Sequence, residues 1–454
     1  MMQETVLTRI VRDKQLWLAE RRQQQPLENF RHKVVASERN FYQALTSDNA
    51  VFILECKKAS PSKGLIRQNF DPRAIAESYR NFASVISVLT DEKYFQGSFD
   101  YLTMVSNQVH QPVLCKDFII DAYQIYLARF YQADAILLML SVLDDEQYTA
   151  LAAVAHSLNM GVLTEVSNEE ELQRAIDLQA RVVGINNRDL RDLSIDLNRT
   201  RTMAPRLSAS TIVISESGIH NYQQIRELSQ YANGFLIGSA LMSEPELDLA
   251  IRRIIFGANK VCGLTREEDA TAAYNAGAIY GGLIFVGKSP RYIDLVQAEK
   301  VVAAAPLKWV GVFSNAQLEA ITLATERLNL SVIQLHGNED AQYIADLRAR
   351  LPQHCQIWKA QSVTDTLPEL NNPDIDHYLL DNGAGGTGRA FDWQLLKDQQ
   401  LHNIVLAGGL NPTNVTDAVE LGCCGLDFNS GLESQPGHKD IAKINAVFSI
   451  LRQY

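Results

Sequence analysis

The sequence predicts an α/β protein made of two tandem (β/α)8 barrels, the fold known as the TIM barrel, with a helical extension before the first. A chain of 454 residues is long enough for two domains. Short apolar runs rich in β-branched residues alternate with stretches of helical periodicity, which favours parallel strands joined by helices. This alternation repeats about every 25 residues and yields eight units in each half, the number that closes such a barrel.

The first half begins with about 47 residues that are predicted to form extra helices covering one mouth of the barrel. Eight expected strands then begin near residues 51, 84, 113, 135, 161, 182, 211 and 234. Between them lie helical patterns such as NEEELQRAIDLQA at 168–180 and NYQQIRELSQYA at 221–232.

The second half repeats the count, with expected strands near residues 260, 280, 308, 332, 356, 377, 403 and 425. We expect domains at 1–257 and 258–454, because an apolar helix ends with Arg252 and Arg253 and with Gly257 as its cap. Two doubly wound open sheets are the alternative architecture. Neither half carries a GxGxxG after its first strand, which disfavours that alternative.

Composition narrows the functional classes. The net charge of −11 offers no broad basic face, so no nucleic-acid partner is expected, although a few focused cations could bind an anionic small molecule. Six cysteines without a CxxC pair fit a reducing, cytoplasmic compartment. The N-terminus lacks the apolar core of a signal peptide, and no run approaches the ~18–20 apolar residues of a membrane span. A soluble protein is expected.

Polar residues gather at the predicted carboxyl ends of the strands in the first half, where such barrels carry their chemistry. The set is Glu55 with Lys57, Lys116, Glu165, Asn186 with Arg188, and Glu216. Strand alternation puts Glu55 and Lys57 on the same face, pointing into the barrel mouth. A solvated loop or a structural ion pair would explain one such strand end, but not five.

Both halves close with small residues after their seventh and eighth strands. The first half has SESGI at 215–219 and IGSAL at 237–241, and the second has AGGL at 407–410 and FNSGLE at 428–433. Such turns leave backbone N–H groups free to surround a phosphate. A single instance could be an ordinary glycine-rich turn, but the matched pair predicts one phosphate in each barrel.

The second half has a different set of strand ends, with Cys262, His336, Lys359 and Asp381. A glycine-rich segment, NGAGGTGRAFDW at 382–393, follows Asp381 and could fold over a ligand. A cysteine acts as a general base only if its pKa falls well below the usual ~8.5. Taken alone, Cys262 is better read as a buried apolar residue; opposite Asp381 across a barrel mouth, it is a candidate base.

The motifs resemble two enzyme families across essentially the whole chain. ECKKASPSKG, VLTDEKYFQGS, LCKDFIID, LTEV, GINNRDL, SESGI and IGSAL resemble indole-3-glycerol-phosphate synthase. KVCGLTR, KSPR, IQLHG, GGTGRAFDW, AGGL and DFNSGLE resemble phosphoribosylanthranilate isomerase. Their order and fusion resemble the bifunctional tryptophan-pathway enzymes of enteric bacteria.

For the second half, the resemblance implies an Amadori rearrangement of N-(5-phosphoribosyl)anthranilate to 1-(2-carboxyphenylamino)-1-deoxyribulose 5-phosphate. It makes Asp381 the acid that opens the ribose ring and Cys262 the base at C2. An acid role at neutral pH requires a raised pKa for Asp381. The implied substrate-binding residues are Arg291 for the anthranilate carboxylate, His336 and Asp427, and Gly408, Gly409, Ser430 and Gly431 for the phosphate.

For the first half, the resemblance implies closure of that product to indole-3-glycerol phosphate with loss of CO2 and water. Lys116 is then the acid at the ketone oxygen, Lys57 holds the carboxylate, and Glu165 and Glu55 are the acid/base carboxylates. Positioning falls to Asn186, Arg188 and Glu216, and phosphate binding to Ser60, Ser217, Gly218, Gly238 and Ser239. Neither reaction is expected to need a metal or other cofactor.

Two rival hypotheses remain at this point. One barrel could be a non-catalytic module, or Lys57 or Lys116 could form a Schiff base as in aldolases. A monomer is expected. The sequence leaves open which glutamate makes which proton transfer and whether the intermediate is channelled.

Overall fold

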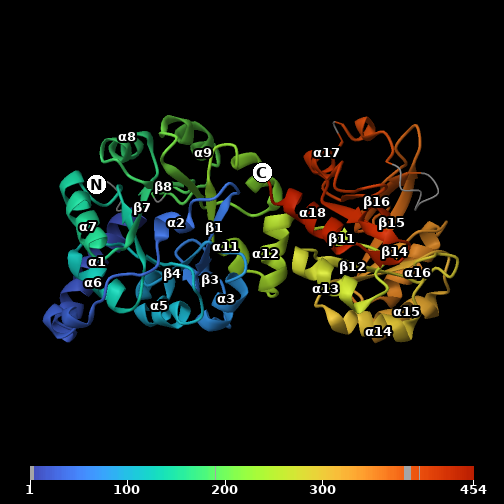
Figure 1. Ribbon diagram of the computed structural model, residues 1–454, viewed down its shortest axis with the longest axis horizontal. Helices are drawn as coiled ribbons and strands as arrows, with labels where there is room; N and C mark the ends of the chain where they lie inside the picture. The colour runs from blue at the N-terminus through green and yellow to red at the C-terminus, as the bar shows by residue number, and fades with distance from the viewer. Residues whose placement is uncertain (1–4, 190, 383–389, 398) are drawn as a thin grey trace. The chain divides into compact units, whose positions relative to one another are not determined.

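The computed structural model describes residues 5–189, 191–382, 390–397 and 399–454. The chain divides into two compact units, residues 1–251 with Tyr454 and residues 252–453. Each unit closes eight parallel strands into a barrel (Figure 1). The predicted fold class is therefore confirmed, and the alternative of two open sheets is wrong.

The first barrel contains all eight strands that the sequence predicts, and they pair in the order β1-β10-β9-β8-β7-β6-β5-β4. Every pairing is parallel, as in the register of Ile53 with Val85. The strands are β1 (Val51–Cys56), β4 (Val85–Leu89), β5 (Val113–Lys116), β6 (Ala135–Met139), β7 (Gly161–Val166), β8 (Val182–Asn186), β9 (Ile212–Glu216) and β10 (Gly234–Ile237).

Helices around this barrel often begin at an Asp or Asn whose side chain accepts a backbone N–H. Asp121 and Asp144 form full capping boxes, and Asn168 and Asn221 cap two later helices. The helices are α3 (Pro72–Tyr79), α4 (Glu92–Phe95), α5 (Phe99–Ser106), α6 (Ala122–Phe130), α7 (Asp145–Ser157), α8 (Glu169–Asp177), α9 (Asn198–Met203), η3 (Ala204–Arg206), α10 (Tyr222–Leu228) and α11 (Ser239–Met242).

The N-terminal extension reaches both ends of the first barrel, whereas the sequence predicted cover for one mouth. It comprises α1 (Val6–Gln24), η1 (Leu27–Asn29), η2 (Arg31–Lys33) and α2 (Phe41–Ala44). The start of α1 lines the cavity at the carboxyl ends of the strands. At the other end, Phe41 packs into the core, where a Cβ added to Gly161 at the start of β7 would strike its ring.

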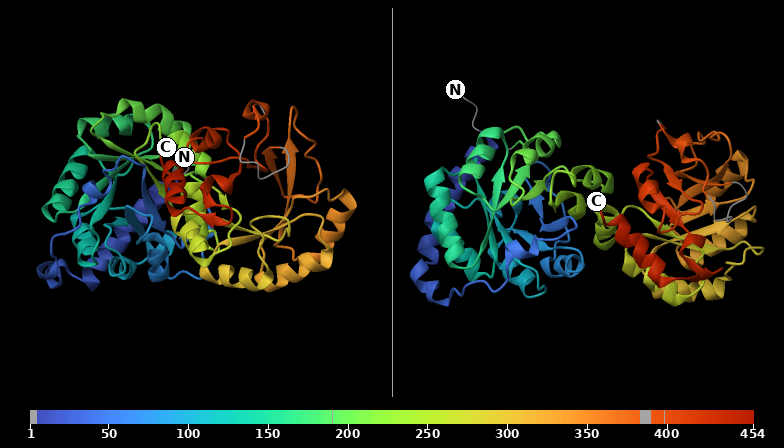
Figure 2. Two further views of the ribbon diagram at one scale, coloured as in Figure 1. Left: turned by 45° about the vertical axis from the view of Figure 1, so that its right-hand side comes forward. Right: turned by 45° about the horizontal axis from the view of Figure 1, so that its top comes forward.

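The second barrel also contains all eight predicted strands, in the order β11 to β18. The strands are β11 (Lys260–Val261), β12 (Tyr280–Ile284), β13 (Lys308–Phe313), β14 (Val332–Leu335), β15 (Gln356–Val363), β16 (His377–Asn382), β17 (Ile404–Leu406) and β18 (Gly425–Phe428). The helices are α13 (Glu267–Ala276), α14 (Leu295–Ala304), α15 (Leu318–Leu328), α16 (Ala341–Arg350), η4 (Trp393–Leu396), α17 (Val415–Glu420), η5 (Ser430–Leu432) and α18 (Ile441–Leu451). Figure 2 shows each barrel with its strands inside a ring of helices.

Each barrel has a packed interior core, and the candidate functional residues lie in this core or next to it. In the first, Val51 and Ile53 of β1 lie in this core and Leu54 does not. Side chains alternate along a strand, so Glu55 continues the inward face that Val51 and Ile53 begin. In the second, Cys262 itself is part of the interior cluster.

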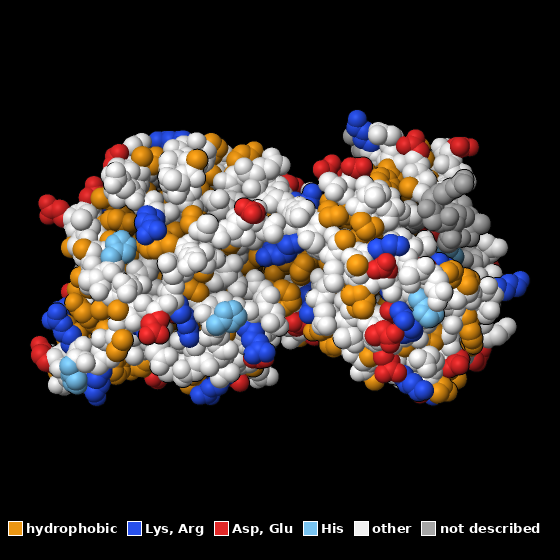
Figure 3. All heavy atoms as spheres, viewed as in Figure 1, with side chains coloured by type: hydrophobic (Ala, Val, Ile, Leu, Met, Phe, Trp, Pro, Cys, Tyr) orange, Lys and Arg blue, Asp and Glu red, His pale blue; other side chains and the backbone are white. Residues whose placement is uncertain are grey.

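The chain passes from one barrel to the next through α12 (Leu247–Phe256). Gly257 has a φ of 86°, and its N–H donates to the carbonyl of Arg253 at 3.1 Å. Only glycine adopts this conformation readily, so Gly257 ends the helix as predicted. A search of the described residues finds no helix with the length and apolar character to cross a bilayer. On the face drawn in Figure 3, Lys and Arg are interspersed with Asp and Glu.

Candidate active sites

One cavity of about 220 Å³ lies at the carboxyl ends of the first barrel's strands. It brings together every residue that the sequence assigns to this site. These are Glu55, Lys57, Ser60, Lys116, Glu165, Asn186, Arg188, Glu216, Ser217, Gly218, Gly238 and Ser239. The residues that the sequence assigns to a site in the first barrel therefore line a single cavity.

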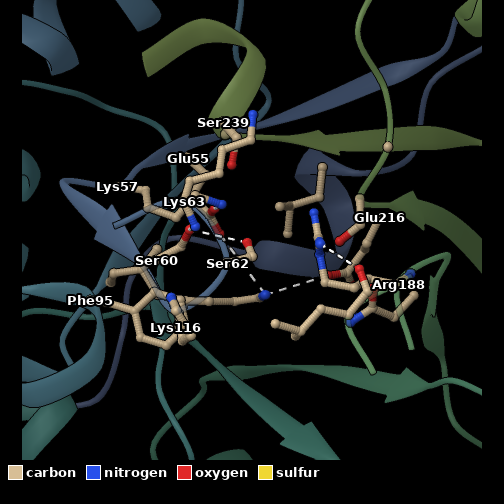
Figure 4. A pocket seen from close by; sticks show the side chains of 18 of the residues that line it. Glu55, Lys57, Ser60, Ser62, Lys63, Phe95, Lys116, Arg188, Glu216 and Ser239 are labelled. Atoms are coloured by element: carbon tan, nitrogen blue, oxygen red, sulfur yellow. Dashed lines mark hydrogen bonds and ion pairs between the residues drawn. The ribbon is translucent and has the colours of Figure 1, made fainter. Parts of the chain in front are cut away.

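Lys116 lies at the centre of the polar groups, at the end of β5 (Figure 4). Its Nζ is 3.4 Å from Glu216 Oε2, 3.7 Å from Glu165 Oε2 and 3.9 Å from Glu55 Oε2. Burial alone would lower the pKa of Lys116, but the three carboxylates outweigh it, so the pKa is raised and the ammonium form is held. The site thus presents a fixed proton donor whose charge is balanced locally.

Glu55 and Lys57 form an ion pair of 2.8 Å at the end of β1. Burial favours the neutral form of Glu55, yet Lys57 and then Lys116 hold its pKa below the usual value. Ser87 donates to Glu55 Oε2 at 3.4 Å. Glu55 is therefore an ionised carboxylate shared by two lysines.

Glu216 behaves differently. Burial, with further contributions from Glu165 and Glu55 against the effect of Lys116, raises its pKa to about 8. Its Oε1 is buried and has no hydrogen-bond partner among the described residues. A Cβ added to Gly184 on the neighbouring β8 would lie against this oxygen. Glu216 therefore binds a proton more readily than Glu55 does, a distinction that sequence alone did not reveal.

Asn186 and Arg188 link the end of β8 to these groups. Asn186 Nδ2 donates to Glu165 Oε1 at 3.1 Å, and the N–H of Arg188 donates to Asn186 Oδ1 at 3.0 Å. Arg188 Nη1 donates to the carbonyl of Leu193 at 2.9 Å, so the guanidinium is held at the rim of the cavity.

The expected phosphate turn follows β9. Ser217 and Gly218 have φ values of 65° and 80°, a consecutive left-handed pair. Gly238 and Ser239 lie at the start of α11, and Ser60 comes from the hairpin of β2 (Ala59–Ser60) and β3 (Gly64–Leu65). These backbone groups line the cavity together, as an anion site requires.

Several lining residues were not predicted. Lys63 and His220 add nitrogen groups near the turn. An apolar wall comes from α1 and from the loops after the strands, through Val6, Leu7, Ile10, Leu89, Phe95, Phe118, Leu193 and Ile195. Strand parity does not point to the loop and extension residues among them, although Leu89, Phe95 and Phe118 lie within motifs that the sequence analysis quotes.

In the second barrel, a buried lysine that the sequence analysis did not single out lies next to Cys262. Lys260 Nζ contacts Asp427 Oδ2 at 2.7 Å and Gln334 Oε1 at 2.8 Å. Burial raises the pKa of Cys262, and Lys260 only partly offsets it. The protein's own groups therefore do not lower the pKa of Cys262 to the value that a cysteine base needs. The alternation of Lys260 and Cys262 along β11 could have revealed this pair.

Arg291 is already engaged. Its Nε and Nη2 donate to the two oxygens of Glu433, each at 2.8 Å. Lys439 contacts the same carboxylate at 2.8 Å. A substrate carboxylate at Arg291 would therefore share this cation with Glu433, a partner that the sequence analysis did not foresee.

Asp381 ends β16, and its Oδ1 accepts the N–H of Asn382 at 2.7 Å. His336 follows β14, and Gln334 Nε2 lies 3.5 Å from its Nδ1. Burial lowers the pKa of His336, while the charge of Asp381 acts in the opposite direction. Lys359 instead binds Glu339 at 2.7 Å. Residues 383–389 of the glycine-rich segment lie outside the described residues.

The second expected phosphate turn has the geometry of the first. Gly408 and Gly409 have φ values of 89° and 65°. Asn411 and Asn414 both donate their side-chain amides to the carbonyl of Gly409. The segment with Ser430 and Gly431 lies directly beside this turn, because a Cβ added to Gly431 would meet the carbonyl of Leu410.

Within the described part of the chain, no group of three or more His, Cys, Asp or Glu side chains is arranged to hold a metal ion.

Fold and sites together define the class: an enzyme with two (β/α)8 barrels, each with its polar groups at the carboxyl ends of the strands. The family model for indole-3-glycerol phosphate synthase matches residues 7–254, and that for N-(5'phosphoribosyl)anthranilate (PRA) isomerase matches residues 259–449. The chain belongs to both families.

Relatives match over the full length. The tryptophan biosynthesis protein TrpCF of Yersinia pestis is 66% identical, with 99% of this chain and 95% of that protein covered. TrpCF of Salmonella typhi is 61% identical, with 99% and 100% covered, and TrpCF of Vibrio cholerae is 58% identical, with 99% and 96% covered. The chain is accordingly a bifunctional enzyme of tryptophan biosynthesis, with synthase and isomerase activities.

Proposed function

We propose that the two activities use separate catalytic groups, with the isomerase in the second barrel supplying the substrate of the synthase in the first. The domains are 1–257 and 258–454. The observation that carries the proposal is Lys116, whose Nζ lies within 3.4–3.9 Å of carboxylates from three strand ends. The substrates are anionic phosphosugar–anthranilate molecules.

In the first barrel, Lys116 donates a proton to the ketone oxygen of the open-chain substrate. The ring carbon that bears the carboxylate then bonds to the ketone carbon, CO2 leaves, and the resulting hydroxyl departs as water. Lys57 holds the substrate carboxylate, which replaces part of its ion pair with Glu55. The phosphate lies on Ser60, Ser217, Gly218, Gly238 and Ser239.

The carboxylates divide the proton transfers between them. Glu165 and Glu55 exchange protons with the ring nitrogen and the leaving hydroxyl, and Asn186 orients Glu165 through its 3.1 Å hydrogen bond. Glu216, whose pKa burial raises, helps to hold the substrate together with Arg188.

In the second barrel, Asp381 protonates the ribose ring oxygen and Cys262 removes the proton at C2. Arg291 holds the anthranilate carboxylate, and His336 and Asp427 contact the substrate. Gly408, Gly409, Ser430 and Gly431 bind the phosphate. Because burial raises the pKa of the thiol, its ionisation depends on Lys260 and then Lys439, the cations that lower that pKa.

The enzyme acts in the cytoplasm as a monomer. The reducing environment keeps its cysteines as thiols, and all six are free in the described structure.

Two single variants test the assignment. Lys116→Ala is expected to abolish only indole-glycerol-phosphate formation, and Cys262→Ala only the isomerisation, each measured with its own substrate. Loss of both activities in either folded variant would contradict separate sites. Retention of full activity by a variant would instead favour the non-catalytic-module hypothesis for that barrel.

A Schiff-base mechanism makes a different prediction. Borohydride reduction in the presence of substrate would trap an adduct on Lys57 or Lys116. We expect intact-mass measurement to find none.

A further inference from the structure

The phosphate turn of the first barrel contains a residue in an unfavourable conformation. Ser217 has a φ of 65°, and the left-handed region costs a residue with a Cβ roughly 1–2 kcal/mol. The matched position in the second barrel is Gly408, which adopts φ 89° without that cost. The first barrel must therefore stabilise a turn that glycine provides freely in the second.

Asn187 provides that stabilisation. It is fully buried, and its Nδ2 donates to the carbonyl of Glu216 at 3.0 Å, to the carbonyl of Ser217 at 3.2 Å and to Ser215 Oγ at 3.0 Å. Its Oδ1 accepts from Thr200 Oγ1 at 2.9 Å. Because backbone carbonyls only accept hydrogen bonds, this network fixes which way the amide faces.

Binding these two carbonyls also orients two N–H groups. A trans peptide is planar, with its C=O and N–H pointing in opposite directions. The carbonyl of Glu216 shares a peptide with the N–H of Ser217, and the carbonyl of Ser217 shares one with the N–H of Gly218. When Asn187 holds both carbonyls on its side, both N–H groups turn away from it, and Ser217 and Gly218 line the cavity.

Those N–H groups are available to a ligand. Neither donates to an acceptor within the described residues. Consecutive N–H groups in such a turn form an anion-binding concavity. The loop after β8 covers the other side, since a Cβ added to Gly218 would meet Ile195.

We propose that Asn187 is a positioning residue for the synthase: it holds the left-handed turn at Ser217 and so sets the affinity of the first barrel for the substrate phosphate. The inference rests on the proposed function of this turn as the phosphate site. Asn187 touches neither substrate nor reacting atoms, so its effect appears in binding and not in the chemical step.

The test compares Asn187→Leu, a neutral change of similar size, with Thr200→Val as the matched control. Thr200→Val removes the hydroxyl contacts to Asn187 Oδ1 and Ser215 Oγ but leaves the two carbonyl bonds in place. We expect Asn187→Leu to raise the synthase KM and the inhibition constant of inorganic phosphate by roughly tenfold, with kcat changed by less than about threefold. Thr200→Val should change each by less than about twofold. Because isomerase activity reports only on the second barrel, the retained synthase kcat and an unchanged circular dichroism spectrum report that the first barrel is folded.

A second variant separates turn control from general damage. Because glycine needs no help to adopt the conformation of Ser217, Ser217→Gly in the Asn187→Leu background should recover most of the lost phosphate affinity, compared with Ser217→Gly alone. Additive losses in the double variant would overturn the proposal. So would equal effects of Asn187→Leu and Thr200→Val.

Failure of the underlying phosphate site is distinguishable. If this turn did not bind phosphate, Gly218→Ala would also leave KM and phosphate inhibition unchanged. If Gly218→Ala weakens phosphate binding and Asn187→Leu does not, the phosphate site stands and the inference about Asn187 is wrong.

Discussion

The two barrels use a lysine and carboxylates in opposite ways. In the first, Lys116 is at the mouth of an open cavity among Glu55, Glu165 and Glu216. In the second, Lys260 is wholly buried in the barrel and paired with Asp427, beside the residue proposed to do the chemistry. The first lysine is placed to meet substrate, and the second to support a neighbour. The same fold therefore accommodates both arrangements. The barrel interior contains a buried ion pair, and the carboxyl ends of the strands carry charged groups that face a cavity.

The two turns that we propose as phosphate sites differ less. Both turns carry a consecutive left-handed pair, 217–218 in one and 408–409 in the other, and both have asparagine amides on turn carbonyls. In the first barrel the asparagine is Asn187, which follows β8. In the second barrel, Asn411 and Asn414 follow the turn itself. The two turns share their backbone geometry, but different side chains hold that geometry in each barrel.

The largest expected effect is on the stability of the second barrel. Lys260→Met leaves Asp427 buried without its cation, which should destabilise this barrel by about 3–5 kcal/mol. Urea unfolding followed by tryptophan fluorescence measures it, because Trp309, Trp358 and Trp393 belong to this barrel. Lys260→Met with Asp427→Leu should regain most of the stability without regaining isomerase activity. If Lys57→Met, at the mouth of the first barrel, destabilised that barrel by the same amount, the contrast between the buried and the mouth lysines would be wrong.

The next effect is a pH dependence confined to the first barrel. The folded pKa of Glu216 is about 8, above the unfolded value of 4.5, so the folded state binds the proton more tightly. Its contribution to stability is full below the unfolded pKa and is lost as pH rises toward 8, with a slope of at most about 1.4 kcal/mol per pH unit. Hydrogen exchange of peptides from β8 and β9 should show this decline. Glu216→Gln should flatten it, and an unchanged slope would contradict the raised pKa of Glu216.

A smaller effect distinguishes the two phosphate turns. Gly218→Ala and Gly409→Ala each force a Cβ into the left-handed region, which costs roughly 1–2 kcal/mol and should raise the KM of the corresponding reaction by about tenfold. Steady-state assays with each substrate measure this, and each variant serves as the other's control. A rise in the KM of both reactions from one substitution would mean that the turns are not independent.

The sequence was sufficient to predict the strands of both barrels and the polar strand-end residues that line the first cavity. Strand parity and the rule that chemistry lies at the carboxyl ends act over a few residues, so Glu55 with Lys57 could be placed without a structure. Lys63, Ile195 and the start of α1 could not be placed, because tertiary packing alone brings them to the cavity.

Protonation states were also beyond the sequence. Glu55 and Glu216 both end barrel strands, yet their pKa values shift in opposite directions. Both side chains are equally buried, and the cause is Lys57, which pairs with Glu55 at 2.8 Å, a contact that only coordinates supply. The engagement of Arg291 by Glu433 likewise joins two segments far apart in the chain.

We propose that the two differently built sites share one kind of phosphate turn. A crystal structure with a reduced, phosphate-bearing substrate analogue bound in both barrels tests this most directly. Phosphate oxygens are expected at about 2.7–3.2 Å from the backbone nitrogens of Gly218 and Ser239 in the first barrel and of Gly409 and Gly431 in the second. A phosphate bound away from these turns in either barrel would contradict it.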